Sequence, residues 1–287
     1  MLIIGCGDVG QRVVQQLPSG VRVLALTSNP HRCPALRALG ITPLCGNLDD
    51  ARSLMRLSGL ATRVLHLAPP PNEGRCDPRT RSLLRALQLR GTPKALVYGS
   101  TSGVYGDCQG AVVDETRSLS ATTPRAQRRV DAEASVRLLG RRASRVRTSI
   151  LRIPGIYAPN REGGTPEARL RKGTPVLEPS DDVFTNHIHA DDLARACVKT
   201  LWRGQPQRIY NVCYDSAMRM GDYFDFAADL YGLPRPPRVP RTAAQGQLSV
   251  MLLSFMSESR RIDNTRMKTE LGLRLRYPTV NTGLISD

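Results

Sequence analysis

The chain is poor in lysine and in aromatic side chains. Lys94, Lys172, Lys199 and Lys268 are its only lysines, and aromatic residues make up 5% of its 287 residues. The net charge of +16 is therefore carried almost entirely by arginine. Because few side chains are available for base stacking and the arginines are spread along the chain, a nucleic-acid partner is not favoured. We interpret the positive charge as arginine-rich faces exposed to solvent.

The sequence also lacks paired cysteines and long apolar runs. Its seven cysteines are scattered and never form a C-x-x-C pattern, which argues against a zinc site or a disulfide framework and predicts reduced thiols. No uninterrupted apolar run is long enough to cross a bilayer. Met1 leads directly into an apolar segment, without room for a secretory leader. We expect a cytoplasmic, soluble protein with no membrane partner and no metal.

The opening residues combine a short apolar strand with a glycine-rich turn and a helix. Residues 2–4 are apolar, glycines follow with the spacing G-x-G-x-x-G, and an apolar helical stripe runs through residues 9–17. This order is typical of a dinucleotide-binding turn, where backbone N–H groups and the helix dipole face a pyrophosphate. A purely structural turn is the alternative. The residues expected to hold the pyrophosphate are Gly5, Gly7, Asp8, Val9 and Gly10.

The second apolar strand, over residues 21–26, ends without an acidic residue. An acidic side chain at this point binds the ribose 2′-hydroxyl of NAD, whereas Thr27, Ser28 and Arg32 suit a 2′-phosphate better. The sequence therefore favours NADP over NAD as cofactor, with an arginine in an exposed loop as the alternative. NAD stays open as a second choice.

Later strands contribute further residues to the same edge of the expected sheet. A strand over 42–45 precedes Asn47, and a strand over 63–67 ends in prolines at 69–71. Ligands of open α/β sheets bind at the carboxyl ends of the strands. We therefore expect Asn47, Leu67, Ala68 and Pro69 to contact the cofactor, and His66 to be a core residue.

Four later motifs resemble one family. The first motif spans residues 99–106 and reads G-S-T-S-G-V-Y-G. The other three lie at 151–159, 186–193 and 208–212. Together they resemble the short-chain dehydrogenase/reductase superfamily, in its extended or atypical branch of NAD-dependent epimerases and dehydratases. The resemblance implies that Thr101 is the catalytic Ser/Thr and that Pro154 contacts the cofactor.

One departure from this family concerns proton transfer. The family's Tyr-x-x-x-Lys pair would fall on Arg125 and Arg129, and this sequence has no Tyr-x-x-x-Lys at any other position. Arginine stays protonated and cannot replace the tyrosine, although Arg129 could hold the nicotinamide ribose and Arg125 an anionic substrate group. A solvated helix face is the alternative for both. Tyr105 and Tyr157 are the candidate proton donors, and His187 and His189 are expected to pack or cap a helix.

Together these features predict an α/β protein with a Rossmann-type, doubly wound parallel sheet of about seven strands and a small C-terminal substrate lobe. We expect an NAD(P)-binding domain over 1–158 plus 186–213, and a discontinuous lobe over 159–185 and 214–287. The expected function is an NAD(P)-dependent oxidoreductase or epimerase/dehydratase-like enzyme, acting on a polar, anionic small molecule such as a nucleotide sugar. A catalytically silent NADP-binding sensor or scaffold is the alternative, and a homodimer is compatible with either.

Overall fold

Seven parallel strands form one central sheet. The computed structural model describes residues 1–285, without the side chains of residues 250 and 251. The sheet has the order β12-β7-β5-β4-β1-β2-β3, so the direction of winding reverses between β1 and β4. This confirms the expected Rossmann-type sheet. Its strands are β1 (Leu2–Ile4), β2 (Leu24–Thr27), β3 (Thr42–Cys45), β4 (Arg63–His66), β5 (Ala95–Thr101), β7 (Arg147–Ile153) and β12 (Arg208–Asn211).

Helices cover both faces of this sheet. Successive strand residues point to opposite faces, so Leu96 joins one hydrophobic cluster while Val97 joins another. The first cluster packs under α3 (Ala51–Leu54), α4 (Pro78–Leu87) and α5 (Pro124–Arg142). The other face is covered by α1 (Asp8–Gln15), α2 (Cys33–Ala38), α7 (Ala190–Arg203) and α11 (Thr265–Leu271).

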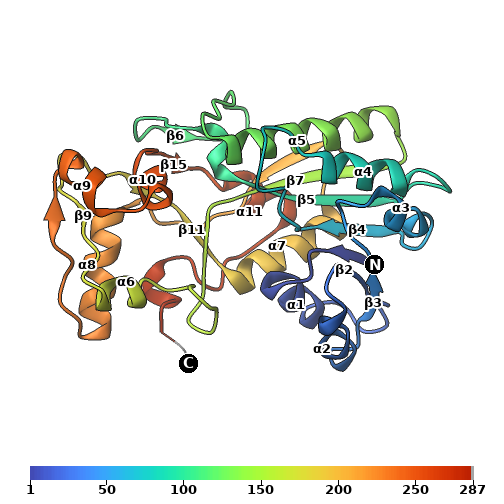
Figure 1. The fold of residues 1–287 in the computed structure, drawn as a ribbon, viewed down its shortest axis with the longest axis horizontal. Helices are drawn as coiled ribbons and strands as arrows, with labels where there is room; N and C mark the ends of the chain where they lie inside the picture. Colours follow the sequence, from blue (N-terminus) through green and yellow to red (C-terminus); the bar gives the residue numbers. More distant parts are fainter. Residues whose placement is uncertain (286–287) are drawn as a thin grey trace.

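A third hydrophobic cluster lies outside the sheet. It is built from residues between Tyr157 and Val183 and between Tyr214 and Leu284. Its helices lie at the opposite end of the long axis from the sheet (Figure 1). They are α6 (Glu167–Arg171), α8 (Met220–Tyr231), α9 (Arg241–Gln247) and α10 (Val250–Met256).

Four two-stranded pairings accompany the central sheet. The antiparallel pair is β10 (Phe184–Thr185) with β13 (Met218–Arg219). The parallel pairs are β8 (Gly155–Tyr157) with β11 (His187–His189), β9 (Val176–Leu177) with β14 (Arg238–Val239), and β6 (Val112–Val113) with β15 (Arg261–Ile262). Three of these pairs, β10 with β13, β9 with β14 and β6 with β15, hold the last third of the chain against earlier segments.

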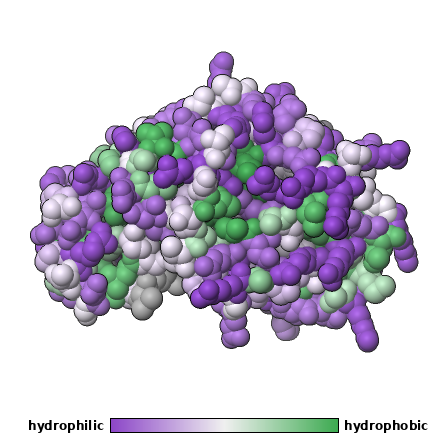
Figure 2. Space-filling model, turned by 90° about the horizontal axis from the view of Figure 1, so that it is seen from above, coloured by the Kyte–Doolittle hydropathy of each residue, from purple (hydrophilic) through white to green (hydrophobic). Residues whose placement is uncertain are grey.

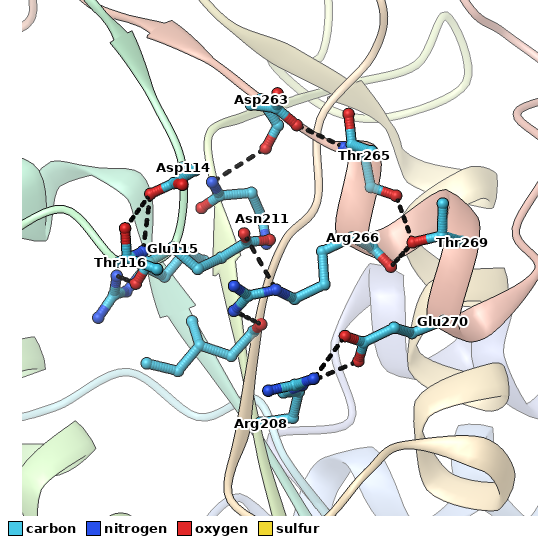
Figure 3. A network of polar contacts seen from close by, with 12 residues as sticks. Asp114, Glu115, Thr116, Arg208, Asn211, Asp263, Thr265, Arg266, Thr269 and Glu270 are labelled. Atoms are coloured by element: carbon cyan, nitrogen blue, oxygen red, sulfur yellow. Dashed lines mark hydrogen bonds and ion pairs between the residues drawn. The ribbon is translucent and has the colours of Figure 1, made fainter.

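A polar network fastens the C-terminal helix to the edge of the sheet (Figure 3). The Glu115 carboxylate accepts the backbone N–H of Asn211 at 2.8 Å and lies 3.4 Å from the Arg266 guanidinium. The Asn211 side chain donates to the Asp263 carbonyl at 3.0 Å. Glu115 and Asn211, the latter from the motif at 208–212, therefore hold α11 in place.

Several sequence-predicted boundaries differ from the structure. The strands expected over 21–26 and 63–67 are β2 (Leu24–Thr27) and β4 (Arg63–His66). The apolar run 95–98 predicts a strand, and β5 continues beyond it to Thr101 because Gly99 to Thr101 pair with Leu151 to Ile153 of β7. Gly91 is expected to close the preceding helix, whereas α4 already ends at Leu87. The expectation that His66 is a core residue is confirmed, since it is buried and bonds Thr80 Oγ1 at 2.9 Å. No helix among residues 1–285 has the length and apolarity that crossing a membrane requires.

Candidate functional site: a cleft at the carboxyl ends of the strands

The glycine turn after β1 leaves space where a phosphate would lie. Gly5 has φ +85°, and a Cβ there would lie 2.4 Å from the Ala68 backbone nitrogen, so a side chain is excluded. A Cβ at Gly7 would meet nothing within 4 Å, whereas at Gly10 it would lie 3.3 Å from the Gly5 carbonyl. The turn is tight at Gly5, closely packed at Gly10 and open at Gly7.

Helix α1 begins beside this open space. No side chain caps its N-terminus, so its first backbone N–H groups and the positive end of its dipole are available to an anion. The Asp8 carboxylate at the first position accepts from Arg12 at 3.1 Å and also pairs with Arg161. These two guanidinium groups offset a negative charge that would otherwise repel a pyrophosphate.

A cavity of about 270 Å³ extends from this turn along the ends of the strands. The residues predicted for the pyrophosphate line it, together with Leu67, Thr101, Arg129 and Pro154. Arg129 donates to the Gly99 carbonyl at 2.7 Å and to the Tyr98 hydroxyl at 3.0 Å, which fixes its guanidinium at the wall. The Thr101 hydroxyl oxygen accepts from Gly103 N at 3.2 Å. Its hydrogen stays free to donate into the cavity.

The other residues predicted to contact the cofactor, which include those for its adenosine end, do not line this cavity. The Arg32 guanidinium donates to the Cys6 carbonyl at 2.7 Å, inside the glycine turn. Thr27 is buried and bonds the backbone of Asn29, whereas Ser28 and Asn47 are exposed. Ala68 donates its N–H to the Ile4 carbonyl at 3.0 Å, and Pro69 is exposed beside it. Of this group, Arg32 has the most direct contact with the turn.

The two candidate proton donors are both occupied. Tyr105 is 1% exposed, is absent from the walls of both described cavities, and donates its hydroxyl to Asn211 Oδ1 at 2.7 Å. Burial raises its pKa to about 12. Tyr157 lines the larger cavity, but its hydroxyl donates to the Thr279 carbonyl at 3.3 Å and burial raises its pKa. We therefore do not retain Tyr105 in the site.

The larger cavity, of about 490 Å³, adjoins the first and is strongly basic. Thr101, Arg125, Pro154, Ile156 and Arg161 line both cavities. Arg169 and Arg260 also line the larger one, and Glu258, the acidic residue of its wall, pairs with Arg260 at 2.8 Å.

Arg169 has an unusual environment. Its guanidinium carbon lies 4.2 Å from the centre of the Phe224 ring, and Nε and Nη2 are buried without a hydrogen-bond partner among the described residues. Burial lowers the pKa of this group. Leaving N–H groups of a buried guanidinium unpaired costs free energy, and an anion reaching them from the cavity would recover it.

His187 contributes an imidazole ring to the wall of this cavity. It stacks on Tyr223 with ring centres 4.5 Å apart, and its Nδ1 lies 3.4 Å from the Tyr214 hydroxyl. Burial lowers its pKa to about 4, so the ring is neutral at pH 7. His189 caps α7 instead, because its Nδ1 accepts from Asp191 N at 3.2 Å. The sequence predicted packing or capping for both.

Sequence reasoning missed the basic wall of the larger cavity. Arg161 and Arg169 lie in a stretch rich in glycine, proline and arginine, and neither belongs to a motif. Only the fold brings them opposite Thr101 and Arg125. No cluster of three or more His, Cys, Asp or Glu residues suited to a metal occurs within the part of the chain that the structure describes.

The profile of the NAD dependent epimerase/dehydratase family matches residues 1–213. The chain belongs to this family. It is 24% identical over 285 residues to protein YeeZ of Escherichia coli K12, covering 96% of this chain and 95% of that one. Its fold matches a conserved protein of unknown function from Silicibacter pomeroyi DSS at a TM-score of 0.81, with 33% identity over 99% of this chain and 95% of that one.

The fold also matches a more distant member with a bound cofactor. The UDP-glucuronic acid 4-epimerase of Bacillus cereus, solved in complex with NAD, has a TM-score of 0.74 and 17% identity over 99% of this chain and 95% of that one. At this identity the match shows a shared fold. In the present chain Arg125 and Arg129 of helix α5 line the smaller cavity.

Proposed function

We propose that the chain is an NAD(P)-dependent oxidoreductase or epimerase that acts on an anionic small molecule. The observation that carries the proposal is the open space at Gly7, which lies before an uncapped helix and continues as a cavity to Thr101 and Arg129. In this proposal residues 1–158 and 186–213 bind the nucleotide. Residues 159–185 and 214–287 supply the substrate lobe.

The nucleotide would lie along the smaller cavity, with its pyrophosphate at the glycine turn and its nicotinamide ring near Thr101. When bound, it exchanges a hydride with the substrate. Arg32 supports a preference for NADP, because its guanidinium already lies beside the turn, bonded to the Cys6 carbonyl, where it could reach a 2′-phosphate. Arg129 would bind the nicotinamide ribose.

The substrate would lie in the larger cavity, with an anionic group on Arg169. Four arginines against one carboxylate in the wall favour such a group, and the unpaired nitrogens of Arg169 supply its donors. A nucleotide sugar is the first class to test, given the epimerase with a shared fold. Thr101 would donate a hydrogen bond to the reacting oxygen, and Arg125 would stabilise negative charge on it.

Proton transfer then needs a group other than the family's tyrosine. His187 lines the cavity, is held by Tyr223 and Tyr214, and is neutral at pH 7. A neutral imidazole can accept the proton of a substrate hydroxyl while the hydride leaves the adjacent carbon. Burial weakens this ring as a base, so the role requires the anionic substrate to raise the pKa of His187 when it binds. His187 is our choice for this role.

Two titrations test the proposal. NADPH and NADH are each added to the purified chain in a calorimeter, and UDP-glucuronic acid and UDP-glucose are then added to the nucleotide complex. Replacing Arg169 by alanine should weaken the binding of UDP-glucuronic acid at least tenfold, the value of one charge-assisted bond. Replacing Arg171, which is exposed and paired with Glu167, should leave it unchanged. Equal effects of the two changes would reject the role of Arg169.

A silent NADP-binding sensor is the second candidate. It is favoured by the arginine at position 125 and by the occupied hydroxyls of Tyr105 and Tyr157. A screen of sugar nucleotides that follows the nicotinamide absorbance separates the two. Tight NADPH binding without turnover of any substrate would favour the sensor.

A further inference from the structure

Two cysteine thiols meet at one edge of the sheet. Cys33 is the first residue of α2, Cys45 is the last residue of β3, and their sulfur atoms lie 3.6 Å apart. Cys33 is buried and Cys45 is exposed. No other two cysteines in the described part of the chain make such a contact. The buried thiol is therefore next to a thiol that solvent can reach.

We propose that Cys33 and Cys45 form a peroxide-sensitive dithiol that closes to a disulfide beside the nucleotide cleft. A disulfide has a sulfur separation of about 2.05 Å, so the two atoms need to approach by about 1.5 Å. The contact joins a strand end to a helix start, where side-chain rotation and a small shift of the helix can supply that movement. The same thiols do not form a metal site, because no third His, Cys, Asp or Glu ligand accompanies them among residues 1–285.

The chemistry follows from the difference in exposure. The Cys45 thiolate attacks hydrogen peroxide, breaks its O–O bond and becomes a sulfenic acid, releasing one water after proton uptake. Cys33 then attacks Cys45 Sγ, the S–S bond forms, and a second water leaves. Two thiols lose two electrons and two protons to one peroxide. Burial raises the pKa of Cys33, which makes it the poorer candidate for the first attack on peroxide.

The position of this pair connects it to the nucleotide site. Cys45 is the register partner of Thr27 across β2 and β3, and Cys33 directly follows Arg32. Arg32 in turn donates to the Cys6 carbonyl in the glycine turn. Drawing Cys33 toward Cys45 therefore moves the start of α2 and the guanidinium that we assign to the adenosine end. This consequence for NADPH rests on the proposed function, whereas the disulfide does not.

Peptide mapping tests the disulfide directly. The reduced, full-length chain is treated with equimolar hydrogen peroxide, free thiols are blocked with N-ethylmaleimide, and the digest is analysed by mass spectrometry. We expect a Cys33–Cys45 cross-linked peptide that dithiothreitol removes. The Cys76→Ser variant, which loses another exposed thiol, should give the same peptide. In the Cys45→Ser variant, Cys33 should stay free.

Two results would overturn the proposal. One is Cys45 recovered as a sulfinic acid with Cys33 blocked by maleimide, and the other is Cys45 linked to Cys76. The effect on the cleft is measured separately by NADPH titration. The oxidised chain should bind about tenfold more weakly than the reduced chain, as expected for a lost charge-assisted hydrogen bond. If the reduced chain binds no NADPH, the proposed function fails while the mapped disulfide still decides this inference.

Discussion

Among single residues, Arg32 has the clearest consequence for cofactor choice. If its guanidinium binds a 2′-phosphate, Arg32→Ala should weaken NADPH binding roughly tenfold or more and change NADH binding much less. Arg37→Ala is the matched control, because Arg37 is exposed in the last turn of α2, the helix that begins directly after Arg32. Calorimetric titration with NADPH and with NADH gives the two affinities of each variant, which are compared with those of the wild-type chain. An equal loss for NADPH and NADH would mean that Arg32 supports the turn rather than selecting the cofactor.

Another single residue, His66, makes stability depend on pH. Burial lowers its pKa to about 3, against about 6.5 in an unfolded chain. Below pH 6.5 the unfolded chain binds a proton that the folded chain does not, so stability falls as the pH falls towards 3. Between pH 7.5 and 5.5 this group should remove about 1.4 kcal/mol from the free energy of unfolding. Urea unfolding at both pH values should show a smaller loss in His66→Gln, and an identical loss would contradict the assignment.

At the scale of helices and strands, α5 is fixed to β7 by a buried ion pair. Arg152 donates to both Glu133 oxygens at 3.2 and 2.8 Å, and Ser100 donates to the same carboxylate at 2.6 Å. Glu133→Gln leaves the arginine charge uncompensated and should destabilise the fold by about 3–5 kcal/mol. The matched change Glu167→Gln breaks an exposed pair with Arg171 and should cost less than about 1 kcal/mol. Chemical unfolding of the two variants measures the difference.

Elements with local signals were predictable from the sequence. The Thr123 and Asp77 side chains cap α5 and α4, as their positions directly before a proline suggest. Strand β5 was predicted too short, since Gly99 and Ser100 have no local preference for a strand and extend it only through pairing with β7. The two-stranded pairings, such as β8 with β11, depend on contacts between distant segments and leave no local signal.

For the whole molecule, the site was predictable only on the nucleotide side. The glycine turn has a spacing that reflects its geometry, so Gly5, Gly7 and Gly10 could be identified from the sequence alone. Arg169 could not, because its role depends on α6 packing against α8, which brings its guanidinium over the Phe224 ring in the wall of the larger cavity. The many other arginines of this basic chain also made Arg169 hard to single out in the sequence. Hydrophilic residues dominate the face in Figure 2, and a half-buried arginine among so many others has no distinguishing sequence pattern.

The measurement that tests the central claim most directly is a calorimetric titration of NADPH into the wild-type chain and into Gly7→Val. A Cβ at Gly7 would meet no protein atom within 4 Å, and the φ of −85° is open to residues other than glycine, so the fold should be retained. The same side chain fills the space assigned to the pyrophosphate. We predict binding to the wild-type chain and a loss of at least a hundredfold in the variant, with an unchanged thermal melting temperature. Equal affinity of the two chains, or no binding to either, would contradict the account.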